Sequence, residues 1–195
     1  MATLTKLLRL PDRGRLLVAA DLHGNLRDFL AIVAHFESLG DDAHLLFLGD
    51  LLHGPYVPLE RWGESTLLRG RPYQDQSPAI LLGLVELMAR HPQRVFALLG
   101  NHEHAHIGGP RTSLFAHDEA AALEQRLGVE TSSWLSQFLR DLPIWAVTGC
   151  GLLFSHAAPA ALLEYPEDLE LIDYRRVNPP VAGRLDGHGT RAGGA

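Results

Sequence analysis

The feature that most constrains the fold is an alternation of short apolar runs and helical patterns, in which each run ends at a polar motif. Residues 15–20 form the first run and lead into Asp21-Leu-His-Gly-Asn25. Apolar residues then recur at helical spacing over 26–39, with Asn25 as the expected N-cap. Strands that alternate with helices are typical of βαβ units, so the pattern predicts an α/β fold with a parallel sheet.

Two further apolar runs repeat this arrangement. Residues 44–48 lead into Gly49-Asp50, and residues 94–99 lead into Gly100-Asn-His-Glu103. The carboxyl ends of parallel strands meet at one edge of a sheet, where ligands bind in such folds. We therefore expect the polar motifs to lie together.

The rest of the chain is expected to add connections, helices and a hairpin. The expected elements are an active-site loop or small cap over 55–76, helices over 78–91 (with Ser77 as N-cap), 118–127 and 131–142, and a tight hairpin at Gly149-Cys150 with arms at 144–148 and 151–154. The second arm ends at Ser155-His156. Residues 1–177 are expected to form one domain, followed by a Pro- and Gly-rich tail over 178–195 that is loop or disorder.

Composition narrows the class of protein. The chain has 195 residues, 46% of them hydrophobic, and 17 basic against 23 acidic residues give a net charge of −6 without a basic block. Nucleic acid is therefore not the expected partner. The single cysteine, Cys150, excludes an internal disulfide. The apolar part of the N-terminus is too short for a signal peptide, and no apolar run approaches the ~18 residues of a membrane span, so we expect a cytoplasmic protein without a membrane partner.

The expected strand ends carry oxygen and nitrogen donors that suit a metal site. They are Asp21, His23, Asp50, Asn101, His102 and His156. Asp21 and His23 are two residues apart, so on an extended segment both side chains would lie on one face and could share a metal. Such a donor set without thiolate suits Mn²⁺, Fe or Zn²⁺. A carboxylate between two sets can bridge two ions, and Asp50 is the expected bridge.

Two bound cations would serve the hydrolysis of a phosphate ester. They neutralise the anionic phosphate oxygens and lower the pKa of a bound water from 15.7 towards ~7. The nucleophile is then metal-bound hydroxide, and no serine or cysteine is required. The sequence thus predicts a metal-dependent phosphoesterase.

These motifs resemble those of the calcineurin-like metallophosphoesterase superfamily, nearest its phosphoprotein phosphatase branch. The matching phrases, in order, are Asp21-x-His23, Gly49-Asp50, Gly100-Asn-His-Glu103 and Ser155-His-Ala157, within roughly residues 15–160. The resemblance implies a four-layer αββα sandwich of two mixed sheets. It also implies two bound divalent metal ions, for which manganese is the first expectation and iron or zinc are the alternatives. It also implies one metal held by Asp21, His23 and Asp50, and a second held by Asp50, Asn101, His156 and a later histidine.

The resemblance gives His102 the role of the non-ligand histidine, which contacts the phosphate and protonates the leaving oxygen. Asn101 is expected at the substrate as well as at a metal. The other histidines of "GNHEHAH", His104 and His106, fall outside the matched phrase and are expected near the site or on the surface. Glu103 belongs to the motif without an assigned role.

Two functional residues of the phosphoprotein phosphatase motif are absent from this sequence. The branch has Gly-Asp-x-x-Asp-Arg-Gly, whereas this chain has His53 and Gly54 in place of the second Asp and the Arg. An uncharged His53 cannot stabilise a protonated His102 as a carboxylate would, so His53 is left as an orienting residue, an extra ligand or a loop residue. For the phosphate clamp we rank Arg111 first, because it follows the GNHE loop. The alternatives are Arg61, Arg69 and Arg71.

The last metal histidine of the family stands in a Gly-His-Thr phrase at the end of a strand. Gly187-His188-Gly189-Thr190 resembles it, but no apolar strand precedes it. Either His188 is the ligand on a degraded strand, or the C-terminal part is truncated or altered and the site is incomplete.

The expected activity is hydrolysis of phosphomonoesters, on a phosphorylated small molecule or a phosphoprotein. Two alternatives stay open. One is hydrolysis of a dinucleoside polyphosphate or phosphodiester, and the other is a non-catalytic binding module on the same fold.

Overall fold

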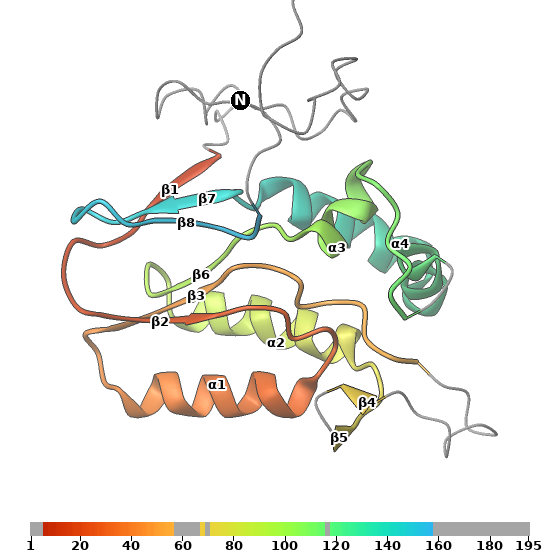
Figure 1. The fold of residues 1–195 in the computed structure, drawn as a ribbon, viewed down its shortest axis with the longest axis horizontal. Coiled ribbons are helices and arrows are strands. Elements are labelled where there is room, and N and C mark those ends of the chain that lie inside the picture. The colour runs from red at the N-terminus through yellow and green to blue at the C-terminus, as the bar shows by residue number, and fades with distance from the viewer. Residues whose placement is uncertain (1–5, 57–66, 69–70, 116–117, 158–195) are drawn as a thin grey trace, which may run out of the picture.

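The structure is a computed structural model that describes residues 6–56, 67–68, 71–115 and 118–157 (Figure 1). Two three-stranded sheets dominate it. The parallel sheet has the order β2-β3-β6, from β2 (Arg15–Ala19), β3 (Ala43–Phe47) and β6 (Val95–Ala97). The mixed sheet has the order β1-β7-β8, from β1 (Leu7–Arg9), β7 (Trp145–Val147) and β8 (Leu153–Ser155).

Helices α1 (Leu26–Ser38) and α2 (Ser77–Arg90) make the two crossovers of the parallel sheet. Both crossovers advance in the same direction across the sheet, and right-handed connections then place both helices on one face. Figure 1 shows both helices below β2, β3 and β6, with the mixed sheet above. The expected α/β class is confirmed, and the described residues supply three of the four expected layers.

Strand β3 shows how the layers are held together. Leu45 and Phe47 belong to the core cluster that includes the helices, whereas Leu46 and the neighbouring Leu48 belong to the cluster with the mixed sheet. Successive side chains of a strand point to opposite faces, so one apolar run can serve both layers. This explains why residues 45–48 are apolar at every position instead of alternating.

The start of α2 differs from the expectation. Ser77 is not its N-cap, because the helix begins at Ser77 itself and has no side-chain cap. The Ser77 hydroxyl instead donates to the Asp75 carboxylate and accepts the backbone N–H of His53 at 2.9 Å. The hydroxyl thus ties the helix to the turn after β3.

Helix α4 (Glu119–Asp141) combines the two helices expected over 118–127 and 131–142. Gly128 interrupts it with a non-helical backbone (φ 76°, ψ 171°), so the two expected segments are confirmed with a sharp break between them. The β7-β8 hairpin is also confirmed, but its turn is longer than Gly149-Cys150. It closes where the N–H of Thr148 donates to the carbonyl of Leu152 at 2.9 Å.

Some elements were not expected from the sequence. The GNHEHAH segment is not a loop but a short helix, α3 (Asn101–His104), continued by the 3-10 turn η2 (Ala105–Ile107). Strand β1 was also not indicated. Within the long segment over 55–76, β4 (Leu67–Leu68) and β5 (Arg71–Pro72) form a small antiparallel pair.

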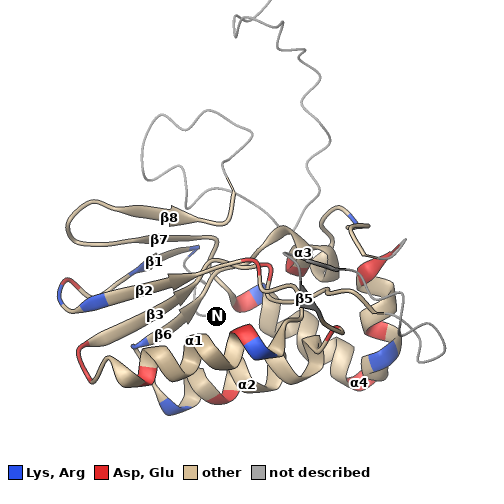
Figure 2. Ribbon diagram, turned by 60° about the horizontal axis from the view of Figure 1, so that its bottom comes forward, with Lys and Arg blue, Asp and Glu red and all other residues tan. Residues whose placement is uncertain are grey.

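Figure 2 shows acidic and basic residues interspersed along α1, α2 and α4. None of the helices in the described ranges combines the length and the apolar character needed to cross a membrane. The expected domain boundary at 177 and the tail over 178–195 lie outside the described residues.

Candidate active site

The polar motifs that follow β2, β3 and β6 come together at the carboxyl edge of the parallel sheet, where they meet His156 after β8. Among the described residues, three groups of side chains place ligand atoms within 4.8 Å of one another, and two of these groups contain Asp50. The first is His23, Asp50 and His102, and the second is Asp21, Asp50 and His156. Asp50 is common to both groups, the position expected of a bridging ligand.

The backbone at these residues lies in the left-handed region. Asp21, His23, Asp50 and His53 have φ of 57°, 46°, 54° and 63°. The extended segment expected at Asp21 and His23 is therefore wrong. The physical reason is that their N–H groups donate to the carbonyls of Gly49 (3.2 Å) and Asp50 (3.0 Å), which joins the two turns. Such conformations cost about 1 kcal/mol or more each and concentrate at functional sites.

The turns after β3 and β6 pack backbone against backbone. A Cβ atom on Gly49 (φ 115°) would lie 2.5 Å from the backbone nitrogen of Gly100, and a Cβ on Gly100 would lie 2.3 Å from that of Asp50. Only glycine allows this approach. The glycines of the two motifs thus bring Asp50 and Asn101 to one place.

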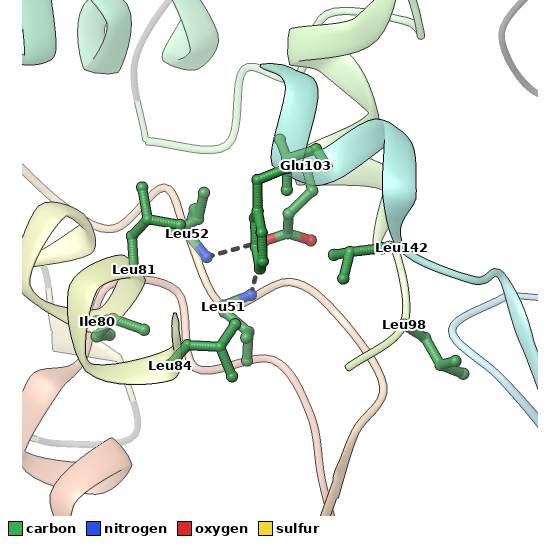
Figure 3. Close-up of a pocket in the computed structure, with 10 residues that line it drawn as sticks. Leu51, Leu52, Ile80, Leu81, Leu84, Leu98, Glu103 and Leu142 are labelled. Atoms are coloured by element: carbon green, nitrogen blue, oxygen red, sulfur yellow. Dashed lines mark hydrogen bonds between the residues drawn. The ribbon is translucent and has the colours of Figure 1, made fainter. Parts of the chain in front are cut away.

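Glu103 holds the Asp50 turn in its conformation. Its buried carboxylate accepts backbone N–H groups from Asp50 (2.7 Å), Leu51 (2.9 Å), Leu52 (3.0 Å) and Gly100 (3.1 Å). Figure 3 shows the carboxylate among leucine side chains, facing two of these donors. Burial and then the charge of Asp50 raise the pKa of Glu103 to about 7, against the lowering effect of the N–H donors. This assigns a role to the motif glutamate, which sequence reasoning left without one.

The Asp50 carboxylate is held from both sides. Its Oδ1 accepts the backbone N–H of His102 at 3.0 Å, and its Oδ2 lies 3.3 Å from Nε2 of His156. Burial alone would raise the pKa of Asp50, but the bonds from His156 and His102 outweigh it and lower the pKa. The bond to Asp50 in turn raises the pKa of His156. Nε2 of His156 also lies 2.9 Å from Oδ1 of Asn101, so the predicted ligands of the second metal converge.

The donor set fits divalent cations. The buried Nδ1 atom of His23 has no hydrogen-bond partner. A metal ion bound there would provide the missing partner. The donors are oxygen and nitrogen only, as suits Mn²⁺, Fe or Zn²⁺. The sequence placed Asp21 at the first metal and His156 at the second. In the structure the two side chains lie close together, with 3.9 Å between Oδ1 of Asp21 and Nδ1 of His156. His188 lies outside the described residues.

A carboxylate stands beside His102 where none was expected. Oε2 of Glu119 lies 3.1 Å from Nδ1 of His102, and both side chains are buried. The other Glu119 oxygen accepts the backbone N–H of Phe115, whereas Oε2 has no hydrogen-bond partner of its own. The carboxylate that the phrase around His53 lacks is thus provided by the first turn of α4. The sequence offers no signal for it beyond an acidic residue at a helix start.

His53 lies against His102 in the interior. Its Nδ1 lies 3.2 Å from Nδ1 of His102 and its Nε2 lies 2.8 Å from Nε2 of His106. Nδ1 of His106 lies 2.7 Å from Oε1 of Glu124 on α4. Burial, followed by His106 and His102, lowers the pKa of His53 to about 2, so the ring is neutral. His106, which we expected near the site or on the surface, is buried behind it.

Asp75 fixes the turn that carries His53. Its carboxylate accepts the N–H groups of Gly54 (3.0 Å) and Ser77 (3.1 Å) and forms an ion pair with Arg126 of α4. Sequence reasoning did not single out this residue. It connects the His53 turn to the helices on both sides.

The arginines proposed as a phosphate clamp stay predictions. Arg111 is exposed, and its Nη1 lies 3.4 Å from Oδ1 of Asp118. Arg61, Arg69 and the side chain of Arg71 lie outside the described residues.

The comparisons with known proteins agree with this fold. The profile of the calcineurin-like phosphoesterase family matches residues 14–186, so the chain belongs to this family. No curated protein matches the chain. Among solved structures, a protein serine/threonine phosphatase from Saccharomyces cerevisiae with similarity to human phosphatase PP5 is 20% identical, with a TM-score of 0.62 over 92% of this chain and 50% of that chain. This likeness shows a shared fold.

Two further solved structures are more distant. A putative diadenosine tetraphosphatase is 20% identical, with a TM-score of 0.46 over 85% of this chain and 62% of that chain. A metallophosphoesterase from Sphaerobacter thermophilus is 23% identical, with a TM-score of 0.39 over 70% of this chain and 44% of that chain. The chain thus spans less than two thirds of the length of each of these proteins.

Proposed function

We propose that the protein is a metal-dependent phosphoesterase that hydrolyses phosphomonoesters, phosphoproteins among them. The observation that carries this proposal is the place of Asp50, which belongs to both donor groups in a chain of the calcineurin-like phosphoesterase family. A shared carboxylate is the feature that distinguishes a two-metal hydrolytic site from a single structural site.

The proposed metal ligands are the residues that the three turns and the β8 end bring together: Asp21, His23, Asp50, Asn101 and His156. Their oxygen and nitrogen donors favour manganese, with iron or zinc as alternatives. When bound, two such cations would neutralise the phosphate oxygens and make a water acidic enough to attack phosphorus near neutral pH. His188 stays a predicted ligand.

His102 is proposed to donate a proton to the leaving oxygen. Its Nε2 points toward the Asp50 carboxylate, with 3.9 Å to Oδ2, and so faces the proposed metal ligands. Its Nδ1 faces Glu119 on the opposite side of the ring. A buried carboxylate at Nδ1 fixes the ring and stabilises its protonated form, as in other histidine-carboxylate pairs. Glu119 thus performs the task for which an uncharged His53 is unsuited.

The test is turnover of an aryl phosphate with added Mn²⁺, compared between the wild type, Asp50→Asn and His102→Ala. We expect Asp50→Asn to lose the activity together with bound metal. His102→Ala should keep the metal and lose about 10²-fold or more in kcat. The exposed His35→Ala on α1 is the control and should retain full activity. Unchanged turnover in both site variants would overturn the proposal.

Elemental analysis and a substrate panel separate the alternatives. About two metals per chain supports the enzyme, whereas none after Mn²⁺ is supplied supports a binding module. Faster cleavage of a dinucleoside polyphosphate or a phosphodiester than of phosphoserine would place the activity in that class. The cytoplasmic location expected from the sequence stays a prediction.

A further inference from the structure

We propose that His53, His102 and Glu119 form a separate site for one zinc ion, on the side of the His102 ring that faces away from Asp50. These three residues are the third group whose ligand atoms lie within 4.8 Å of one another. They come from the turn after β3, from α3 and from the first turn of α4. The proposed ligand atoms are Nδ1 of both histidines and Oε2 of Glu119.

The three atoms are spaced like the ligands of one tetrahedral ion. Nδ1 of His53 lies 3.2 Å from Nδ1 of His102, and Oε2 of Glu119 lies 3.7 Å from the first nitrogen and 3.1 Å from the second. Zinc holds imidazole nitrogen and carboxylate oxygen at about 2.1 Å in tetrahedral geometry, which separates neighbouring ligand atoms by about 3.4 Å. The three observed separations lie on both sides of this value.

The Glu119 carboxylate has an oxygen that lacks a partner. One oxygen accepts the backbone N–H of Phe115, which fixes the side chain, whereas the buried Oε2 has no hydrogen-bond partner. Oε2 and Nδ1 of His102 thus approach to 3.1 Å without a hydrogen bond between them, as two ligands of one ion do. A buried carboxylate is costly without a cation, and zinc would neutralise it.

The contacts behind His53 leave its Nδ1 free to bind a metal. Nδ1 of His106 lies 2.7 Å from the carboxylate of Glu124, which only accepts hydrogen bonds, so His106 carries its proton on Nδ1. Its Nε2, 2.8 Å from Nε2 of His53, is then an acceptor, and His53 carries its proton on Nε2. A metal-binding histidine usually donates its second N–H in this way, which fixes the ring for the ion.

The donor set and its burial favour zinc over manganese. Two imidazoles and one carboxylate are a known zinc set, whereas manganese is suited by carboxylates and water. The side chains of His53, His102 and Glu119 are 0%, 6% and 3% exposed, which leaves little room for water ligands. The hydroxyl of Thr112, 3.3 Å from Nδ1 of His53, lies beside the open side of the three donors.

Zinc bound here should inhibit the enzyme, and this consequence rests on the proposed function. The ion would take Oε2 of Glu119 and Nδ1 of His102 as ligands, so the carboxylate would no longer act on the histidine directly. Nε2 of His102 would still face Asp50, 3.9 Å from Oδ2. The site would thus connect the activity to the supply of zinc through the ring of His102.

Elemental analysis tests the site without an activity measurement. Metal-free protein is given excess Zn²⁺ and then desalted. Asp50→Asn, which should lose the two ions at the sheet edge, is expected to keep one zinc ion. Adding His53→Gln or Glu119→Gln to this variant should remove the ion. Adding His91→Gln should not, because the half-buried His91 lies at the other end of α2.

X-ray absorption at the zinc edge tests the ligands in the Asp50→Asn protein itself. We expect four ligands at about 2.1 Å, with the scattering pattern of two imidazoles. An ion with six oxygen ligands and no imidazole would overturn the site.

Inhibition is tested on the Mn²⁺-loaded enzyme with one added equivalent of Zn²⁺. Turnover of phosphoserine should fall about tenfold or more in the wild type. His53→Gln keeps Glu119 and His102 but lacks one zinc ligand, so its own turnover should fall by much less. Equal inhibition of the two proteins would overturn the inhibitory role.

The outcomes separate the zinc site from the proposed function. A wild type without metal-dependent phosphatase activity overturns the function, and the zinc analysis still tests the site. An active wild type overturns the site if Asp50→Asn keeps no zinc. The site is also overturned if Asp50→Asn keeps as much zinc after His53→Gln and after Glu119→Gln as before.

Discussion

Oε2 of Glu119 lies 3.1 Å from Nδ1 of His102, and the two side chains are 3% and 6% exposed. The glutamate comes from the start of α4 and the histidine from α3, so the contact depends on how two separate helices pack. The buried oxygen has no hydrogen-bond partner of its own, which leaves its charge directed at the imidazole. The pair explains how the site keeps a carboxylate next to its histidine while position 53 is uncharged.

Replacing Glu119 should reduce proton donation more than substrate binding. We expect Glu119→Gln to lower kcat by about 10- to 100-fold on alkyl phosphates, with little change in KM, because the neutral amide no longer stabilises a protonated His102. On an aryl phosphate with a good leaving group the loss should be small. Steady-state kinetics on the two substrates measure the difference.

Glu119→Asp is the matched control for this variant and should recover part of the alkyl phosphate activity. Equal losses on both leaving groups, or a change confined to KM, would contradict the role assigned to Glu119.

Glu103 should act on stability and on metal binding together. Its carboxylate accepts four backbone N–H groups around Asp50, and a glutamine offers only one oxygen in their place. Glu103→Gln should therefore cost about 3 kcal/mol of unfolding free energy in the metal-free protein, since buried N–H groups lose their acceptor. Urea denaturation measures this cost, and titration with Mn²⁺ should show weaker binding than in the wild type. The exposed Glu130→Gln should change neither, and a Glu103→Gln protein of wild-type stability would refute the assignment.

The fold could be predicted because its information is local. The runs over 15–20, 44–48 and 94–99 form β2, β3 and β6, since four or five apolar residues between turn signals define a buried strand. Strand β1 escaped notice because three residues carry too little pattern. The short helix α3 also escaped, because its polar sequence reads as a loop when its contacts with Asp50 are unknown.

The site could be predicted only where it follows the strand ends. Asp50 and His102 follow the carboxyl ends of the parallel strands β3 and β6, where ligands bind in such sheets, and this rule needs no tertiary detail. Glu119 and Glu124 lie on α4, and their approach to the histidines depends on helix packing that no local pattern encodes. The left-handed backbone at Asp21 likewise depends on its bond to Gly49, which lies in the turn after another strand.

Acid should destabilise the metal-free protein through its buried histidines. Burial holds the pKa of His53 near 2, whereas the unfolded chain titrates near 6.5. The unfolded state then binds more protons below about pH 6.5, so stability present above that pH is lost as the pH falls toward 2. A histidine of this kind contributes up to about 1.4 kcal/mol per pH unit in that window.

The measurement is urea denaturation at pH 7.5 and pH 5.5. His53→Gln should show a smaller difference between the two pH values than the wild type, because its side chain does not titrate. His35→Gln, at an exposed position of α1, should keep the wild-type difference. A His53→Gln protein with the same difference between the two pH values as the wild type would contradict the buried neutral state of His53.

Two glycines with similar backbones should respond differently to alanine. Gly49 and Gly151 both have positive φ, 115° and 90°, so a Cβ atom is strained at each by about 1 kcal/mol or more. At Gly151 nothing lies within 4 Å of the added atom, whereas at Gly49 it would lie 2.5 Å from the backbone of Gly100. Gly49→Ala must therefore separate the turns that carry Asp50 and Asn101. We expect it to abolish metal binding and to lose more stability than Gly151→Ala, by thermal unfolding and Mn²⁺ titration. Similar melting temperatures and metal contents in the two variants would show that the close approach of these turns does not build the site.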